Sequence, residues 1–176
     1  HTHGAPVRVA AGQSLQAALD AAHPGGVLEI ERGMYIGNLI VNKPLTLRGL
    51  DRPTLSGGQR GDTIRIGAPD VVIEGLIVRD SGDSLKEQNA GINILPGAHR
   101  AVVRQCELTY NLFGLWIEKA NDVRIEANTI TASGNISAAY FVGNGSQLTG
   151  LPEQYGNANV ASYLPTYTGN ISASNV

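Results

Sequence analysis

The chain has 176 residues and a formal net charge of −2, so no electrostatic footprint points to nucleic acid or to an anionic membrane surface. Its 22 glycines and few aromatic residues favour many short strands and turns over a helical bundle. The single cysteine excludes an internal disulfide framework, and no apolar run approaches the ~20 residues that span a bilayer. We expect neither nucleic-acid binding nor direct membrane insertion.

The chain begins with "HTH", which is a candidate metal site. If His1 is a free N-terminus, its amine, two backbone amides and the His3 imidazole can bind Cu(II) or Ni(II) in a square plane. The His1 ring adds a further donor. Any chain with histidine in third place has this capacity, so an ordinary leading segment or an artificial remnant explains the pattern equally well. No secretory signal peptide is recognised in the chain.

The first periodic segment predicts a helix over residues 14–22. In "GQSLQAALDAAHPGG", Ser14 is a suitable N-cap and the run from Pro24 to Gly26 is a stop signal. Apolar residues recur at helical spacing between them, at Leu15, Ala18, Leu19 and Ala22. We expect this helix to cap the first turn of the fold, with its leucine face against the core.

A strand-scale pattern then recurs, with apolar residues alternating on either side of a short break. It appears as "VVIEGLIV" from Val71, "AVVRQCEL" from Ala101 and "VRIEANTI" from Val123, and "LTLRGL" from Leu45 begins an earlier copy. The steps between copies are 26, 30 and 22 residues. We expect the following side chains to point into one core: Leu47, Val71, Ile73, Leu76, Val103 and Ile125, with Cys106 as a buried filler rather than a metal ligand.

A second track of strands runs parallel to the first. "GINILPGA" from Gly91 matches "GLWIEKA" from Gly114, 23 residues later. Short strands at this repeat length indicate coils that stack on one another at ~4.8 Å. The fold class is therefore all-β, and residues 5–132 are expected to form a right-handed parallel β-helix of about five coils. A leucine-rich repeat is the alternative, but its consensus and its helical returns are missing.

The step of 30 residues contains a polar excursion, "RDSGDSLKEQNAG", between Arg79 and Gly91. Polar insertions on one face of a solenoid are common partner sites, although such loops are also often merely solvated. The candidate partner-facing residues are Asp80, Asp83, Lys86 and Glu87. The same residues are the candidates for polysaccharide lyase, hydrolase or epimerase chemistry. No second cluster follows in register one coil later, so we predict that the chain is not an enzyme and name no catalytic or cofactor-binding residue.

These residues resemble the opening of the NosD family. The resemblance rests on "GQSLQAALDAAHPGGVLEIERGMYIGNLIVNKPLTLRG", "PTLSGGQRGDTIRI", "VVIEGLIVRDSGD" and "AGINI…NLFGLWIE". It includes the element formed by Gly33, Tyr35, Gly37 and Asn38. It covers residues 5–132 but only the early coils of a typical family member.

The resemblance implies a right-handed β-helix in the bacterial periplasm. There the family is the accessory component of an ABC-type complex that helps assemble the copper sites of nitrous oxide reductase. An ABC transporter, the reductase and copper are therefore expected partners by resemblance alone, and spacing shows none of them.

The chemistry of the chain changes near Ala132. All Lys and Arg lie at or before Arg124, and only Glu153 is charged after Glu126. "GNISA" occurs at residues 134–138 and again at 169–173, 35 residues later. Residues 133–176 resemble repeats of tail-fibre proteins of tailed phages. The chain is thus interpreted as a fusion, natural or engineered, with domains at 1–132 and 133–176.

The resemblance of residues 133–176 implies an intertwined homotrimer. Residues 133–176 contain too few large apolar side chains to bury a core within one chain, but three chains together can bury one. The expected assembly core is Phe141, Leu148, Leu151, Tyr163 and Leu164. A disordered Gly/Asn/Ser linker is the alternative.

Three functions are compatible with these patterns. The first is a non-enzymatic structural or binding β-helix joined to a trimerisation segment. The second is a periplasmic accessory protein in copper-site maturation. The third is a virion-associated tail fibre or tailspike component that binds or degrades a polysaccharide.

Overall fold

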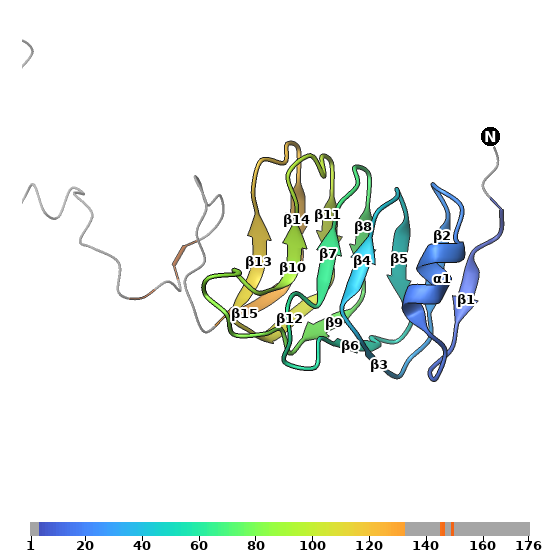
Figure 1. Cartoon of the computed structure of the whole chain (residues 1–176), viewed down its shortest axis with the longest axis horizontal. Helices are drawn as coiled ribbons and strands as arrows, with labels where there is room; N and C mark the ends of the chain where they lie inside the picture. Colours follow the sequence, from blue (N-terminus) through green and yellow to red (C-terminus); the bar gives the residue numbers. More distant parts are fainter. Residues whose placement is uncertain (1–3, 133–144, 147–148, 150–176) are drawn as a thin grey trace, which may run out of the picture. The chain divides into compact units, whose positions relative to one another are not determined.

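The computed structural model describes residues 4–132, 145–146 and 149, and the solenoid lies within the first of two units, residues 1–137 and 138–176. Three parallel sheets wind into an all-β solenoid of about five turns (Figure 1). The predicted domain boundary after residue 132 and the predicted right-handed winding stay predictions.

The three sheets run along the solenoid, and each of its four complete turns contributes one strand to each sheet; β1 precedes these turns, and β14 and β15 follow them. The six-stranded sheet contains β1 (Val7–Val9), β2 (Val27–Ile30), β5 (Thr46–Gly49), β8 (Val72–Glu74), β11 (Val102–Arg104) and β14 (Arg124–Glu126). The five-stranded sheet contains β3 (Met34–Ile36), β6 (Thr54–Ser56), β9 (Ile77–Arg79), β12 (Glu107–Asn111) and β15 (Thr129–Ala132). The four-stranded sheet contains β4 (Leu39–Val41), β7 (Ile64–Ile66), β10 (Ala90–Ile94) and β13 (Phe113–Ile117).

The register confirms the predicted repeat. Leu47 pairs with Ile73, Ile73 with Val103 and Val103 with Ile125, which reproduces the steps of 26, 30 and 22 residues. Ile92 pairs with Leu115 at the predicted step of 23. The expectation of two tracks was too simple, because the first repeat holds two strands. In the third turn these two strands are β8 and β9. A corner at Gly75, whose φ is 72°, separates them.

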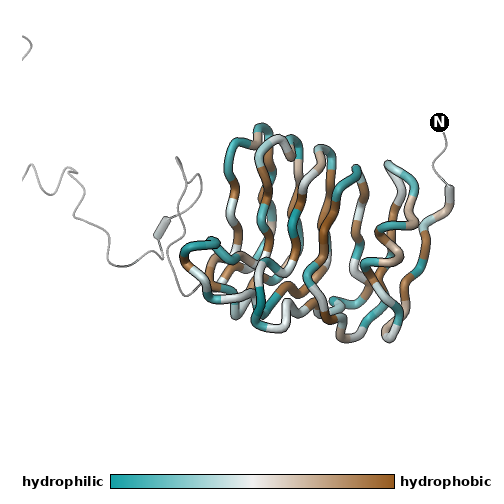
Figure 2. Tube along the Cα trace, viewed as in Figure 1, coloured by the Kyte–Doolittle hydropathy of each residue, from teal (hydrophilic) through white to brown (hydrophobic). Residues whose placement is uncertain are grey.

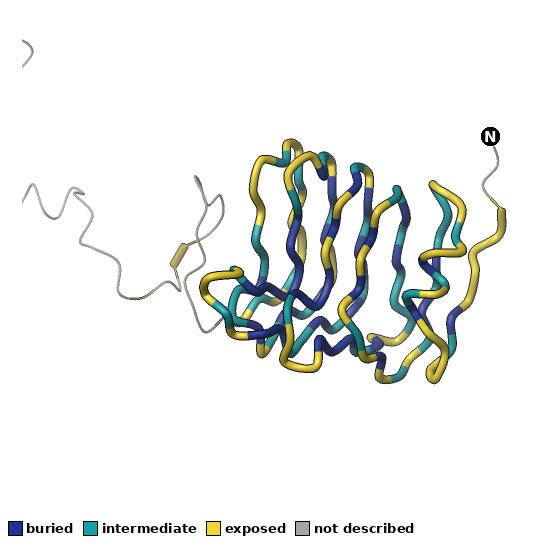
Figure 3. Tube along the Cα trace, viewed as in Figure 1, coloured by how far each residue is buried: buried dark blue, intermediate teal, exposed yellow. Residues whose placement is uncertain are grey.

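The core follows the predicted inward positions. Five of the six named aliphatic side chains are buried, and hydrophobic, buried stretches recur in successive turns (Figures 2 and 3). The buried ones are Leu47, Val71, Ile73, Leu76 and Val103. The expectation for Ile125 was wrong, since this side chain is 36% exposed. It lies on β14, the last strand of its sheet in the described part of the chain, so it packs against a neighbouring strand on one side only.

The predicted helix is present as α1 (Leu15–Ala21). The Ser14 Oγ accepts a 3.1 Å hydrogen bond from the Ala17 N–H, which confirms the N-cap, and Leu15 and Leu19 are buried. The helix lies beside β4, an edge strand of the four-stranded sheet. There the Gln16 side chain accepts from the Ile40 N–H at 2.9 Å and donates to the Ile40 carbonyl at 3.1 Å, as a neighbouring strand would.

The outer face of the six-stranded sheet carries a ladder of alternating charge. One position in each of its six strands is in register with the next, and the sign changes at every step. We call this row the charge ladder; its members are Arg8, Glu29, Arg48, Glu74, Arg104 and Glu126. Because opposite charges on neighbouring strands attract and like charges repel, the ladder favours this register over its alternatives.

Glu74 is the most buried member of the charge ladder. Its two carboxylate oxygens accept hydrogen bonds of 2.6 Å from the Nε atoms of Arg48 and Arg104, one from each neighbouring turn. Burial alone would raise the pKa of the Glu74 carboxyl, but these two hydrogen bonds and the two guanidinium charges together outweigh burial and hold the pKa below its usual value. Glu74 therefore joins three turns through one ionised side chain.

We expect Glu74→Gln to lower the free energy of unfolding at neutral pH by about 1–3 kcal/mol, because an amide cannot replace both charged hydrogen bonds. A carboxyl with a lowered folded pKa stabilises the fold above its unfolded pKa of ~4.3 and loses that effect as pH falls through the folded pKa. The difference between wild type and variant should therefore be complete at neutral pH and shrink in acid, as measured by urea unfolding.

Glu126→Gln at the exposed end of the charge ladder is the matched control, with an expected change of under ~1 kcal/mol. Equal losses in the two variants, or a Glu74 effect that persists in strong acid, would contradict the role of Glu74.

Candidate functional site

The candidate site lies at the corner where each turn leaves the five-stranded sheet and enters the four-stranded one. Gln59, Asp80 and Tyr110 occupy this corner in successive turns, with φ values of 61°, 60° and 54°. The Gln59 N–H donates to the Asp80 carbonyl at 2.9 Å, and the Asp80 N–H donates to the Tyr110 carbonyl at 3.1 Å. Left-handed backbone costs roughly 1–2 kcal/mol for a residue with a Cβ, so stacking holds each residue in a conformation it would otherwise avoid.

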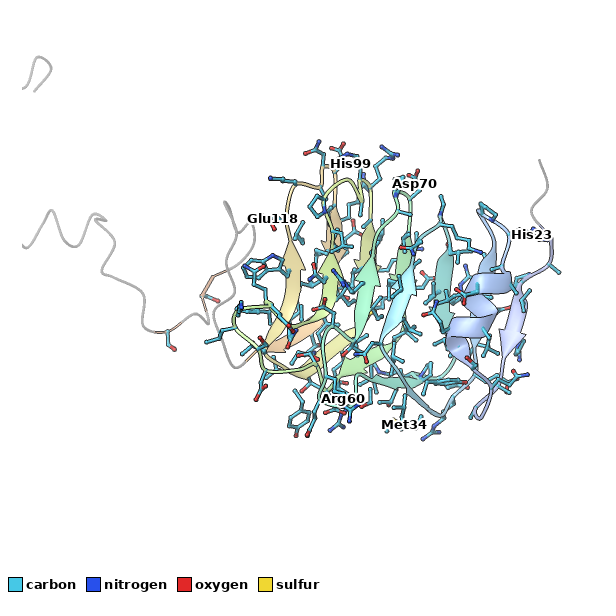
Figure 4. The ribbon with its side chains drawn as sticks, in the orientation of Figure 1. His23, Met34, Arg60, Asp70, His99 and Glu118 are labelled. Carbon is cyan, nitrogen blue, oxygen red and sulfur yellow. The ribbon has the colours of Figure 1, made fainter. Side chains whose placement is uncertain are left out.

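An open groove of about 820 Å³ runs along this corner. We call it the corner groove. In the described part of the chain its lining spans four turns, from Gln59 through the segments 79–83 and 109–112 to Thr131. Arg60, labelled in Figure 4, follows Gln59 at the same corner.

Asp80 is fixed at the centre of the corner groove. Its Oδ2 accepts hydrogen bonds from the Ser56 Oγ at 2.8 Å and from the Arg79 Nε at 3.0 Å. The Arg79 guanidinium also lies over the Tyr110 ring, 4.6 Å from its centroid. A carboxylate, a guanidinium and an exposed aromatic ring are thus held together before any ligand arrives.

Buried Asn111 supports the floor of the corner groove. Its Oδ1 accepts from the Ser81 N–H and its Nδ2 donates to the Val78 carbonyl, each at 3.1 Å. Both partners belong to the preceding turn, so the side chain replaces backbone pairing where the strands diverge. Asn128 repeats the arrangement at another corner, with the Cys106 N–H at 2.9 Å and the Val103 carbonyl at 2.8 Å.

Asn38, the last residue of the motif formed with Gly33, Tyr35 and Gly37, fastens the loop that carries Gln59. Its Nδ2 donates to the carbonyls of Arg60 at 2.5 Å and of Asp62 at 2.8 Å. The motif's aromatic member, Tyr35, is buried and donates from its hydroxyl to the Glu31 carbonyl at 2.7 Å. Asn38 therefore holds the corner in place, whereas Tyr35 packs in the core.

The excursion between β9 and β10 is a loop (Figure 1) whose first residues line the corner groove. Asn89 closes it twice, because its N–H donates to the Ser84 carbonyl at 3.2 Å and its Oδ1 accepts from the Ser84 N–H at 2.9 Å. Leu85 is 70% exposed on this loop, and Lys86 and Glu87 follow it as exposed residues. A large apolar side chain is thus displayed between polar neighbours on an ordered loop.

The structure divides the four predicted partner-facing residues. Asp80 and Asp83 line the corner groove, whereas Lys86 and Glu87 lie on the excursion loop outside it. Sequence reasoning missed Gln59, Arg79 and Tyr110. Their left-handed backbone or their stacking on a neighbouring turn cannot be recognised from the sequence of one repeat.

The remaining predicted sites lie largely outside the described residues. These are His1 and His3, and the assembly core of Phe141, Leu148, Leu151, Tyr163 and Leu164. Among residues 4–132, 145–146 and 149, no group of three His, Cys, Asp or Glu side chains is placed to hold a metal ion. Cys106 is buried as expected, and burial raises the pKa of its thiol, which disfavours the thiolate that metals bind.

The described lining of the corner groove contains carboxylate, guanidinium, amide, hydroxyl and phenol groups but no histidine, cysteine or lysine. Such a set can hydrogen-bond to a ligand and stack against it. Fold and groove together define a parallel β-solenoid with a polar groove at one corner.

The chain is similar to two curated proteins that share one description. Over 138 residues, or 78% of this chain, it is 28% identical to "Probable ABC transporter binding protein NosD" of Pseudomonas aeruginosa. Over 104 residues, or 59% of this chain, it is 27% identical to the protein of that name from Stutzerimonas stutzeri. The matches cover only 32% and 24% of those relatives, so the chain corresponds to a third of their length or less. No protein-family profile and no solved structure matches the chain.

We expect Asn111→Ala to lower the free energy of unfolding by about 1–3 kcal/mol, because it leaves a buried N–H and a buried carbonyl unpaired. Asn128→Ala removes the same pair of hydrogen bonds where water has partial access, and should cost less. Urea unfolding measures both. Equal losses, or none for Asn111, would contradict the idea that this side chain supports the groove.

Proposed function

We propose that the chain is a non-catalytic binding or scaffold β-solenoid that meets its partners at the corner groove and the excursion loop. The observation that carries the proposal is the preformed cluster of Arg79, Asp80 and Tyr110, which spans two turns and is tied to a third by the hydrogen bond from Ser56. A cluster that is ordered before the ligand arrives favours binding, because less conformational freedom is lost in the complex.

The partner proposed for the excursion loop is an ABC transporter, and the proposed location is the periplasm. Support comes from the printed name of the two relatives and from the parallel β-solenoid expected of the NosD family. The described residues contain no helix that is both long and apolar enough to cross a membrane. Leu85, flanked by the polar residues Ser84 and Lys86, offers an apolar anchor for a protein surface.

Copper-site maturation of nitrous oxide reductase is a finer proposal that rests on the family resemblance alone. His1 and His3 are the candidate ligands that the sequence predicts. Copper binding that survives acetylation of the N-terminal amine would support this role. If acetylation abolishes copper binding, the chain has only the generic N-terminal copper site.

The transporter proposal is tested on the whole chain by interferometry against the Pseudomonas aeruginosa ABC transporter to which the relative's name refers. We expect Leu85→Asp to weaken binding by tenfold or more, since it places a charge in an apolar contact. Ile36→Asp is the matched control, because Ile36 is also an exposed aliphatic residue but lies on β3. Equal effects of the two substitutions would exclude the excursion loop as the contact.

The same samples test the absence of catalysis. We expect no released reducing ends and no unsaturated products from neutral or acidic polysaccharides. Turnover that Asp83→Asn abolishes would overturn the non-catalytic proposal in favour of a polysaccharide-degrading tailspike or related enzyme.

We further propose that α1 caps the N-terminal end of the solenoid and that residues 133–176 hold a homotrimer. The bonds from Gln16 to the edge strand β4 support the cap. The trimer rests on the composition and tail-fibre resemblance of residues 133–176. Light scattering of the whole chain at micromolar concentration should give the mass of three chains, and Leu148→Asp combined with Leu164→Asp should give that of one. A single-chain mass for the wild type refutes the trimer.

A further inference from the structure

We infer that the corner groove binds an uncharged saccharide. The inference rests on the proposed binding function and specifies the ligand class that the groove accepts. Four properties of the groove support it: unused hydrogen-bonding capacity, an exposed aromatic ring, charge and length.

Several groups that line the groove have unused hydrogen-bonding capacity. Within the described residues, no side-chain hydrogen bond is made by Gln59, Asp83, Thr109 or Thr131, although all four line the groove. The Asp80 Oδ1 is also free, because both of the hydrogen bonds to this carboxylate end on Oδ2. The groove therefore presents donors and acceptors together, which suits sugar hydroxyls because each can donate and accept.

Tyr110 supplies the apolar contact that a sugar ring needs. It is 71% exposed and is the one aromatic residue among the described non-glycine residues with left-handed φ. The faces of a pyranose carry C–H groups, which pack against the electron-rich face of an aromatic ring. The Arg79 guanidinium over the ring fixes its orientation and leaves further N–H donors beside it.

The charge of the groove disfavours anionic ligands. Its described lining carries one cation, Arg79, and two carboxylates, Asp80 and Asp83. The cation is already paired with Asp80 at 3.0 Å. A phosphate or a uronic acid would therefore meet net negative charge, whereas a neutral sugar can use the carboxylates as acceptors.

The length of the groove suits an oligosaccharide. Its lining spans four turns, and three steps of ~4.8 Å give about 14 Å along the solenoid axis. An extended peptide is a weaker fit, because β9 and β12 are each paired on both sides and offer no free backbone edge. Two carboxylates without a third ligand also fit poorly to a divalent cation.

The test is titration calorimetry of the whole chain with neutral hexasaccharides, namely cellohexaose, maltohexaose, mannohexaose and N-acetylchitohexaose. Hexagalacturonate is the acidic comparator. We expect one-site binding of at least one neutral hexasaccharide and none of hexagalacturonate. Tyr110→Ala should weaken that binding tenfold or more, and Tyr110→Phe should retain it, because the ring rather than the hydroxyl makes the contact.

Lys119→Ala is the matched control, because Lys119 also has left-handed φ, at 54°, but lies at another corner of the same turn. This variant should bind as wild type does. The inference is overturned if no neutral hexasaccharide binds at millimolar concentration, if only hexagalacturonate binds, or if Tyr110→Ala and Lys119→Ala behave alike. Transporter binding is measured on the same preparations. If the wild-type chain binds the transporter but no neutral hexasaccharide, the saccharide inference is refuted and the proposed function still stands.

Discussion

The structure depends on parallel pairing of each turn with the next in a single register. Strands of three to five residues make few hydrogen bonds each, so backbone pairing alone specifies the register weakly. Side chains on both faces strengthen it. Leu47, Ile73 and Val103 stack inside the solenoid, while the charge ladder stacks outside it. A slip of one residue would bring ladder charges into the core and aliphatic groups into water, which is strongly unfavourable.

Short strands concentrate the remaining structural problems at the corners. Each turn changes direction three times, and the described chain uses twelve non-glycine residues with positive φ to do so. Where strands diverge, backbone groups lose their neighbours, and the Asn111 and Asn128 amides take their place. The corners therefore combine strained backbone with fixed polar side chains, the usual setting of a binding site.

The repeat was predictable because inward aliphatic residues recur wherever a strand must pack. Sequence spacing thus placed Leu47, Ile73 and Val103 correctly, and the helix signals placed Ser14 at its N-cap. The exposure of Ile125 was not predictable, since it depends on whether a further strand pairs with β14 rather than on β14 itself. The charge ladder and the groove were missed for a related reason. Their members, such as Glu74 or Tyr110, acquire meaning only from residues 20 to 30 positions away.

The division between sheet faces and corners is also the reason that we propose recognition at a corner. On the six-stranded sheet, both carboxylate oxygens of Glu74 are already engaged by arginines of the neighbouring turns. An extra residue in one of these strands would disturb its pairing with the strands on either side. At the corner after β9, by contrast, the excursion lengthens one step to 30 residues while β11 still pairs in register with β8. Side chains there can serve a ligand because the register does not depend on them.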